Sequence, residues 1–204
     1  MAEVTVIDYG LGNTQAFMHV YDRLNIEVEA ASTPDALARA KRLILPGVGS
    51  FDWAVMRLNQ SGLRETLDET VLGHKRPILG VCVGMQMMAE RSDEGSEPGL
   101  GWIDAEILDM ARANNQSAPL PHMGWNDVEA IETDTLFRGI EASRYYFLHS
   151  FYMRPRDEAD NLATTVYGNR FTAAIHRGNI FGTQFHPEKS HQWGIRLLRN
   201  FAAL

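Results

Sequence analysis

The chain has 204 residues, a formal net charge of −7 at pH 7, 45% hydrophobic residues and a single cysteine. This length suits one domain with a substantial core, so we expect a single domain over residues 1–204. The acidic balance argues against nucleic-acid binding, which requires a basic surface. The cysteine cannot form an internal disulfide, the amino terminus lacks the features of a signal peptide, and no apolar run approaches the ~20 residues of a membrane span. The sequence therefore predicts a cytoplasmic protein that binds neither nucleic acid nor membranes.

The first half of the chain alternates between strand and helix patterns. Strands are predicted at residues 3–8, 27–31, 42–47 and 77–82. Helices are predicted at residues 14–24, after Thr33 as N-cap with Pro34 at the first helical position, and at residues 52–72 with a break near Gly62. The strand at 77–82 is wholly apolar, which is typical of a central strand in a parallel sheet. This alternation predicts a parallel sheet with helices on both faces.

The second half of the chain is dominated by strand patterns, at residues 105–110, 126–131, 144–152, 162–168, 171–178 and 180–187. Few helical segments separate them, so we expect antiparallel hairpins that extend the sheet. A helix is predicted at residues 194–201, and the polar residues 90–99 are expected to form a surface loop. The predicted fold class is α/β: a central, mostly parallel sheet flanked by helices, with an antiparallel extension.

The only cysteine, Cys82, lies in the stretch ILGVCVGMQ, where an apolar strand runs directly into a helical pattern. Such a corner strains the backbone and holds the side chain at the carboxyl edge of the sheet, and Gly80 and Gly84 would relieve the crowding. The start of a helix also favours a thiolate, because its dipole and free N–H groups stabilise negative charge. The stretch therefore favours a nucleophile elbow of the form G-x-C-x-G. A buried cysteine of the core is the alternative.

A nucleophilic thiol needs a base, and His186 is the best candidate among the seven histidines. In the stretch FHPEKS an extended backbone would put Glu188 on the same side as His186, with Pro187 stiffening the link. A carboxylate that orients an imidazole beside a thiol is a general arrangement for an activated nucleophile. The other histidines are predicted to lie in the core or behind the site (His122, His149) or on the surface without acidic neighbours (His19, His74, His176, His191).

A third element is the glycine-rich stretch LPGVGSF, in which Gly47 and Val48 follow another apolar strand. Glycine lets backbone N–H groups approach a ligand closely. One such N–H and the N–H of Val83, directly after the cysteine, could together form an oxyanion hole. A plain turn between a strand and a helix is the alternative.

Two other kinds of site are less well supported. The stretch DYGLGN has part of a dinucleotide fingerprint, but Gln15 stands where its third glycine belongs. A zinc site made of Cys82, His186 and Glu188 is conceivable, although the sequence has no paired ligand spacing to support it.

Together these motifs resemble the class I glutamine amidotransferases of the triad type. The similarity runs nearly end to end through IDYGLGN, LPGVGSF, GVCVGMQ, SDEG, GLG, PHMGWN, YFLHSFY and FGTQFHPEKS, in that order. The stretch PHMGWN resembles in particular the glutaminase subunits of imidazole glycerol phosphate synthase, from histidine biosynthesis. The resemblance implies one glutamine amidotransferase type 1 domain over residues 1–204, which hydrolyses L-glutamine to glutamate and ammonia.

The resemblance also implies a role for individual residues. Cys82 would attack the side-chain amide of glutamine, His186 would act as base and then as acid, and Glu188 would orient the His186 ring. The oxyanion would lie against Gly47, Val48 and Val83. The substrate pocket would be formed by Gln86, Glu94, His149, Ser150 and Phe151. The face toward a partner would be formed by Asn13, Trp125, Asn126, Tyr146 and Lys189.

A partner is implied because free ammonia is protonated in neutral water and then no longer nucleophilic. The resemblance implies a heterodimer with a separate (β/α)₈-barrel cyclase subunit, and neither a cofactor nor a metal. Three alternatives remain: a paralogous glutaminase that supplies ammonia for amidation of a surface-polysaccharide sugar, an inactive binding or regulatory subunit, and a cysteine hydrolase of another substrate. The complete triad argues against the second, and PHMGWN argues against the third.

Overall fold

The computed structural model describes residues 2–113 and 118–204. The elements in chain order are β1 (Val4–Ile7), α1 (Thr14–Arg23), β2 (Val28–Ala31), α2 (Pro34–Ala38), β3 (Leu43–Gly47), α3 (Phe51–Gln60), α4 (Arg64–Asp68), the π-helix η1 (Glu69–Gly73), β4 (Ile78–Cys82), α5 (Val83–Gln86), β5 (Arg91–Ser92), β6 (Ala105–Asp109), α6 (Met110–Ala113), β7 (His122–Ala130), β8 (Ser143–His149), β9 (Phe151–Pro155), the 3₁₀ helix η2 (Glu158–Asp160), β10 (Asn161–Tyr167), β11 (Asn169–Arg177), β12 (Ile180–Thr183), the 3₁₀ helix η3 (Pro187–Lys189) and α7 (His191–Ala202).

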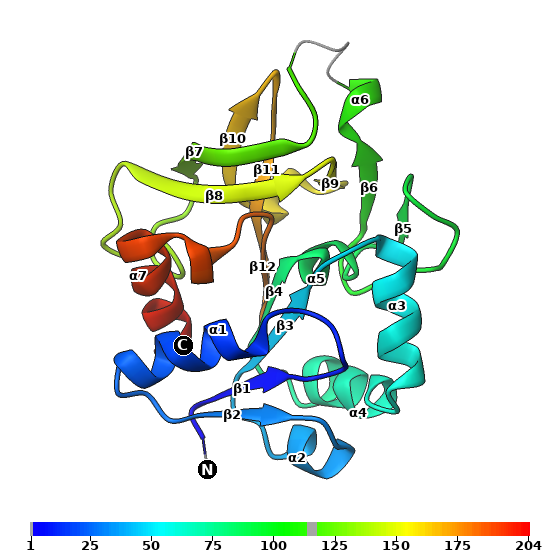
Figure 1. The fold of residues 1–204 in the computed structure, drawn as a ribbon, viewed down its shortest axis with the longest axis vertical. Coiled ribbons are helices and arrows are strands. Elements are labelled where there is room, and N and C mark those ends of the chain that lie inside the picture. The colour runs from blue at the N-terminus through cyan, green and yellow to red at the C-terminus, as the bar shows by residue number, and fades with distance from the viewer. Residues whose placement is uncertain (1, 114–117) are drawn as a thin grey trace.

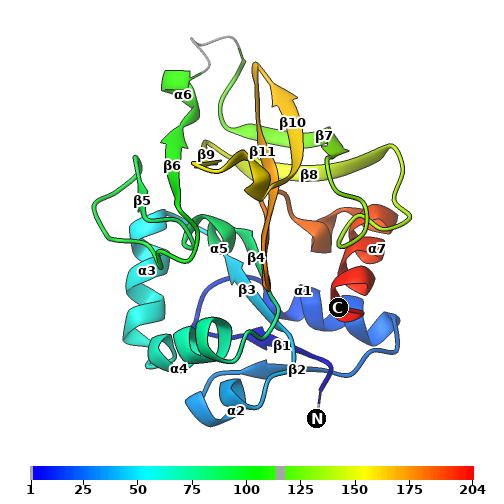
Figure 2. The same cartoon turned by 180° about the vertical axis from the view of Figure 1, so that it is seen from behind.

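Within the described residues, a nine-stranded sheet has the order β2-β1-β3-β4-β12-β11-β10-β7-β8. Its first five strands are parallel, and the remaining pairings are antiparallel. Helices α1 and α7 cover one face of the parallel part, and α3 and α4 cover the other (Figures 1 and 2). A smaller sheet has the order β5-β6-β9. The predicted fold class is therefore confirmed, including the antiparallel extension.

The first half of the chain folds as its pattern predicts. Thr33 caps α2 by accepting a hydrogen bond from the N–H of Ala36, and Pro34 occupies the first helical position. The helical region at 52–72 breaks at Gly62, which has a φ of 76° and separates α3 from α4. Strand β4 is fully buried because β3 and β12 flank it and helices cover both of its faces.

The second half differs from the prediction in two places. The segment 144–152, expected to be one strand, bends at Ser150 and divides into β8 of the large sheet and β9 of the small sheet. The Ser150 carbonyl accepts a hydrogen bond from the N–H of Met110, which holds the bend against the small sheet. The segment 180–187 is a strand only to Thr183, so Gln184 and His186 lie beyond the carboxyl end of β12. Both departures place backbone around Cys82.

Two further boundaries also move. Helix α7 begins at His191, three residues before its predicted start. The polar segment 90–99 contains the short strand β5 and is otherwise a loop, as expected. The loop is tied to α3, because the Asp52 carboxylate accepts hydrogen bonds from the N–H groups of Ser96 and Glu97.

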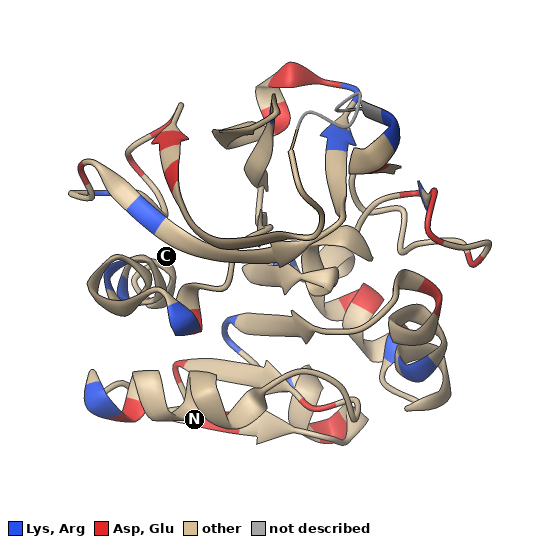
Figure 3. Cartoon of the chain, turned by 45° about the horizontal axis from the view of Figure 1, so that its top comes forward, with Lys and Arg blue, Asp and Glu red and all other residues tan. Residues whose placement is uncertain are grey.

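Charged positions of both signs are interspersed over the elements, without a face of a single sign in the view of Figure 3. None of the helices in the described part of the chain has the length and apolar character needed to cross a bilayer.

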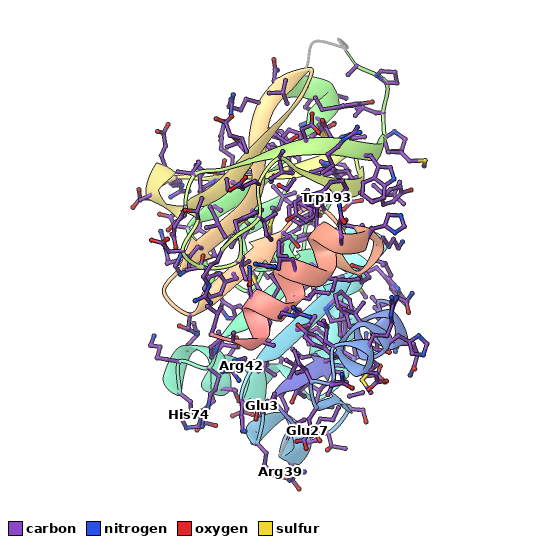
Figure 4. The ribbon with its side chains drawn as sticks, turned by 90° about the vertical axis from the view of Figure 1, so that its left-hand side faces the viewer. Glu3, Glu27, Arg39, Arg42, His74 and Trp193 are labelled. Carbon is purple, nitrogen blue, oxygen red and sulfur yellow. The ribbon has the colours of Figure 1, made fainter. Side chains whose placement is uncertain are left out.

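At the end of the molecule away from β7 and β8, Glu3 pairs with Arg42 at 3.1 Å, and Figure 4 shows both residues far from Trp193 of α7.

Candidate active site

Cys82 occupies a strained corner between β4 and α5, with φ 55° and ψ −114°. A non-glycine residue with positive φ is uncommon and costs free energy, so the surrounding structure must hold it in place. The flanking glycines are required by space. A Cβ on Gly84 would lie 2.0 Å from the Leu45 carbonyl oxygen, and one on Gly80 would lie 2.8 Å from that of Gly84. The predicted elbow geometry is confirmed, although α5 ends at Gln86 and is shorter than expected.

A cavity of about 330 Å³ opens beside the cysteine, within the size range of small-molecule sites. Its wall combines the elbow, the loop after β3, the loop before β6 and the bend between β8 and β9. The lining residues are Val48, Gly49, Cys82, Val83, Gln86, Glu94, Pro121, Leu148, His149, Ser150, Phe151, His186 and Lys189. All five residues expected to bind substrate therefore line one cavity with Cys82 and His186.

His186 and Glu188 form a buried pair, with 2.8 Å between Nδ1 and Oε1 and side-chain exposures of 6% and 3%. The predicted contact is confirmed, but the expected extended backbone is wrong. Residues Pro187–Lys189 form a 3₁₀ turn, and this turn brings the carboxylate back beneath the ring. Among the described residues, the other carboxylate oxygen of Glu188 is buried without a hydrogen-bond partner. The carboxylate is thus directed at the imidazole.

The His186 imidazole favours its protonated form. Burial alone would lower its pKa, but hydrogen bonds to Cys82 and Glu188, together with the charges of both groups, outweigh burial and raise the pKa of His186 to about 10. At neutral pH both ring nitrogens therefore carry a proton, and the ring donates to the carboxylate of Glu188 on one side and to the sulfur of Cys82 on the other.

The backbone around His186 is anchored to strand β8. The His186 N–H donates to the Tyr146 carbonyl at 2.9 Å. The Ser190 hydroxyl donates to the His186 carbonyl at 2.6 Å and accepts from the Tyr146 N–H at 3.0 Å. Ser190 is fully buried. The position of the His186 ring is therefore set by β8 as well as by its own turn.

Two polar side chains present oxygen atoms to the cavity. Both hydrogens of the Gln86 amide are used, by the Phe151 carbonyl and by Gln184 Oε1, each at 3.0 Å. This leaves the Gln86 carbonyl oxygen for a ligand. Glu94 accepts the Phe51 N–H at the start of α3 at 2.7 Å through one oxygen, which leaves its other oxygen. Burial raises the pKa of Glu94, and the bond from Phe51 partly opposes that effect.

The histidines His122 and His149 form a second buried pair behind the cavity, as predicted for residues that support the site. His149 Nδ1 lies 2.8 Å from the Phe151 carbonyl, which can only accept, so this nitrogen carries the proton. His149 Nε2 then accepts from His122 Nδ1 at 2.9 Å. Desolvation lowers the pKa of His122 to about 4 and that of His149 to about 3, so both rings are neutral near pH 7.

The predicted oxyanion residues lie at the junction of β3 and the elbow. Gly47 pairs with Cys82 across the sheet, and a Cβ on Gly47 would lie 2.1 Å from the Gly84 nitrogen. This glycine is therefore required for the close approach of β3 to α5. Val48 is 41% exposed, whereas Val83 is buried, and both residues line the cavity.

Four of the five residues expected to face a partner form a connected group, which reaches the cavity at Lys189. Trp125 and Tyr146 are paired across β7 and β8, with 6.3 Å between ring centroids, and the Lys189 ammonium lies 5.9 Å from the Tyr146 ring. Asn13 caps α1 and lines a small cavity together with Lys189. Asn126 is set apart from them, because its amide donates to the Val166 carbonyl at 2.9 Å.

The aromatic surface around Trp125 continues onto α7. The His191 ring stacks on Trp125 with 5.1 Å between centroids, and the Trp193 ring lies 6.2 Å from it. Figure 4 shows Trp193 on the side of α7 that faces the neighbouring strands.

The prediction of surface histidines without acidic neighbours is wrong for His176, which is half-buried, lies 3.2 Å from Glu132 and stacks on Phe181.

Sequence reasoning missed two residues beside Cys82. Gln184 Nε2 lies 3.8 Å from the sulfur, and Gln184 is fully buried. Its place two residues before His186 was a usable signal, because alternate residues of an extended segment point to the same side. Tyr9 is buried next to the elbow, and its hydroxyl donates to the Pro46 carbonyl at 2.8 Å. Burial and the nearby Cys82 charge raise the pKa of Tyr9. No sequence pattern singles out Tyr9.

The two alternative kinds of site receive no support from the geometry. In DYGLGN, Gly12 packs so closely on Pro46 that a Cβ would lie 2.6 Å from its side chain, and the turn is closed by a hydrogen bond from the Gly10 N–H to Asp8. This packing turns the loop against β3. Over residues 2–113 and 118–204, no three His, Cys, Asp or Glu side chains are arranged to hold a metal ion.

Fold and site together define an α/β protein whose single cysteine stands at the carboxyl edge of a parallel sheet, beside a buried His–Glu pair. Residues 5–203 match the class-I glutamine amidotransferase family, and the chain belongs to this family. It is therefore an enzyme, a glutamine amidotransferase.

Similar sequences support this assignment, and a solved structure shares the fold. The chain is 48% identical, over 98% of its length and the whole of the relative, to imidazole glycerol phosphate synthase subunit HisH of Bdellovibrio bacteriovorus. It is 45% identical, over 98% of its length and 99% of the relative, to subunit HisH 2 of Pseudomonas aeruginosa. A crystal structure of a glutamine amidotransferase has the same fold, with a TM-score of 0.76 at 21% identity, covering 98% of this chain and 99% of that one.

Proposed function

We propose that this chain is the glutaminase subunit of an imidazole glycerol phosphate synthase and hydrolyses L-glutamine to glutamate and ammonia. The proposal is supported by relatives of that name, which are up to 48% identical and match the chain over nearly its full length. The observation that carries the activity is the shared cavity of Cys82 and His186, with the protonated His186 ring between the Cys82 sulfur and the Glu188 carboxylate. We further propose that residues 1–204 act as one domain and that the protein works in the cytoplasm.

The first half of the reaction uses the pair in its charged form. The Cys82 thiolate adds to the side-chain carbonyl carbon of glutamine, and the π electrons move to the oxygen. The resulting oxyanion is stabilised by backbone N–H groups of Val48 and Val83. As the C–N bond breaks, His186 gives its proton to the leaving nitrogen, so that ammonia and a thioester form.

The second half of the reaction restores the enzyme. The neutral His186 takes a proton from water while the water oxygen attacks the thioester carbon. Collapse of this second tetrahedral species breaks the C–S bond and expels the thiolate, and the product is glutamate. Glu188 remains charged and keeps the ring in one orientation through its 2.8 Å contact with Nδ1.

The cavity also offers a rationale for substrate binding. The α-ammonium group of glutamine is a donor, and both oxygen atoms left free by the local hydrogen bonds, on Gln86 and Glu94, are acceptors. The two residues would therefore bind this group, and the backbone of Ser150 and Phe151 would line the opposite wall. Neither a metal nor a cofactor takes part in these steps.

The ammonia would pass to a (β/α)₈-barrel cyclase subunit in a heterodimer. The relatives are named as subunits, which supports a partner of this chain. Exposed apolar residues beside the cavity, Trp125 and Leu148 among them, give that partner a surface to cover. Protein covering the mouth of the cavity would keep ammonia away from water.

The test is a complementation experiment with purified controls. A bacterial strain that lacks its own glutaminase subunit of imidazole glycerol phosphate synthase should grow without histidine when it expresses this chain together with its barrel partner. Cys82→Ser should not restore growth unless ammonium salts are abundant. Release of glutamate without any restoration of histidine synthesis would instead favour the paralogue that supplies ammonia for a polysaccharide sugar.

A further inference from the structure

Gln184, in the loop after β12, is a second polar side chain besides His186 that reaches the Cys82 sulfur. It is fully buried between two elements, with Gln86 of α5 on one side and Cys82 on the other. Its Nε2 lies 3.8 Å from the Cys82 sulfur, a hydrogen-bond distance for sulfur, and its Oε1 lies 3.0 Å from Gln86 Nε2.

The orientation of the Gln184 amide is fixed by a chain of partners. The Phe151 carbonyl can only accept, so the Gln86 atom 3.0 Å from it must be the amide nitrogen. This same nitrogen faces Gln184 at 3.0 Å and needs an acceptor there, which identifies the Gln184 atom as oxygen. The remaining Gln184 atom, the one facing the sulfur, is therefore the NH₂ group, a donor.

Some groups around the sulfur favour the thiolate form of Cys82, and others favour its neutral thiol form. A donor stabilises the thiolate, which accepts hydrogen bonds, and Gln184 and the protonated His186 are such donors. The Leu148 carbonyl, 3.9 Å away, can only accept and therefore favours the neutral thiol. The other titratable groups around this centre are Tyr9 and Glu188, and the cavity wall adds Glu94, His149 and Lys189. The Tyr9 hydroxyl is already donating to the Pro46 carbonyl.

We propose that Gln184 is a further catalytic residue, whose side-chain amide donates a hydrogen bond to the Cys82 thiolate and is held in that orientation by Gln86 and the Phe151 carbonyl. The consequence for turnover rests on the proposed glutaminase function. The interaction with the sulfur does not, because it concerns the resting protein.

The experiment measures the rate of Cys82 alkylation by iodoacetamide as a function of pH, without glutamine. Gln184→Glu keeps the shape and the acceptor for Gln86, but it aims an acceptor at the sulfur in place of the donor. Gln184→Leu removes both the donor to the sulfur and the acceptor for Gln86 and places no charge beside the sulfur. Loss of one hydrogen bond to a charged group corresponds to an upward shift of the alkylation midpoint by about one pH unit for Leu. The shift should be larger for Glu, because a carboxylate repels the thiolate.

Gln60→Leu, at the exposed end of α3, is the matched control and should leave the midpoint unchanged. Equal midpoints in the native protein and both Gln184 variants would overturn the inference. Should the variants fail to fold, as judged by circular dichroism, the native protein still decides the question. The NMR signal of the Gln184 side-chain amide should then move with pH at the alkylation midpoint, and this movement should be absent in Cys82→Ser. A Gln184 amide signal that does not move with pH at the alkylation midpoint would refute the contact with the Cys82 sulfur.

The outcome is separable from that of the proposed function. A midpoint shift in a protein that does not hydrolyse glutamine would support the hydrogen bond and contradict the glutaminase. Unshifted midpoints in a protein that does hydrolyse glutamine would contradict the hydrogen bond and support the glutaminase.

Discussion

The N–H of His186 donates to the carbonyl of Tyr146 at 2.9 Å, which joins the loop of His186 to the edge strand β8. Across β7 and β8, Tyr146 is paired with Trp125, which is exposed beside the cavity mouth. A partner that shifts β8 would therefore also shift the backbone of His186. The same strand ends in His149, so it contributes both to the wall of the cavity and to the position of His186.

Ser190 is the side chain that reinforces this junction, and Ser190→Ala should weaken it. The substitution removes two hydrogen bonds in a fully buried place and leaves the Tyr146 N–H without its partner. We expect a loss of about 1–3 kcal/mol in the free energy of unfolding. We also expect a drop of about tenfold in kcat with little change in KM, corresponding to about 1.4 kcal/mol. Urea unfolding and glutamate release measure the two effects, and an unchanged kcat would show that the junction does not position His186.

Cys82→Ser should abolish glutamine hydrolysis, because a serine hydroxyl at neutral pH is a far weaker nucleophile than a thiolate. The swap barely changes shape, so the fold and the affinity for the partner should persist. Glutamate release and a pull-down with the barrel subunit are the measurements. Turnover retained in the purified variant would exclude Cys82 as the nucleophile.

His186→Ala should be nearly as damaging as loss of Cys82, since members of one catalytic unit are strongly non-additive. Glu188→Gln should cost less, because Glu188 orients the ring and stabilises its charge without touching the substrate. With the partner present, the synthase reaction should still run on added ammonium salts in both variants. Absence of this rescue would locate the defect in assembly of the complex.

The pH dependence of stability should have two arms. The pKa of His186 is raised to about 10, so its contribution is fully present below about pH 6.5 and is lost as pH rises toward 10. The pKa values of His122 and His149 are lowered to about 4 and about 3, so their contribution is present above about pH 6.5 and is lost as pH falls toward 4. Calorimetric Tm values should therefore fall on both sides of neutrality. In His186→Ala the alkaline arm alone should flatten, and an unchanged profile would contradict the assignment.

The free subunit should be nearly idle. The Gly47–Val48 peptide borders the cavity beside exposed Val48, and rotation of this peptide would add or remove one oxyanion donor. Loss of one oxyanion donor lowers the rate by a factor of roughly 10²–10³. Docking of the barrel subunit with its acceptor ligand would favour the donating orientation. Glutamate release should be measured for the subunit alone, with partner, and with partner plus ligand. Equal rates in all three would mean that the site is permanently assembled.

The sequence by itself determined the parts of the site that lie close together along the chain. The apolar strand, the glycines and the start of a helix around Cys82 predicted the elbow, because only small residues fit a turn this tight. The spacing of His186 and Glu188 predicted their contact, even though the backbone between them proved to be a 3₁₀ turn. Periodicity likewise predicted the parallel half of the sheet and the antiparallel extension. These are local properties, set by sterics and by hydrophobic pattern.

The tertiary structure alone decided which distant segments share the cavity. The bend at Ser150 moves the chain from one sheet to another and brings the Phe151 carbonyl to Gln86, 65 residues away. The identity of the donor facing the sulfur follows from the Phe151 carbonyl through Gln86 to Gln184, and this chain of partners spans three elements. Likewise, His122 and His149 are neutral because both are buried against each other, a consequence of pairing between β7 and β8. Burial, partner geometry and protonation depend on contacts between segments far apart in sequence, and no spacing along the chain encodes them.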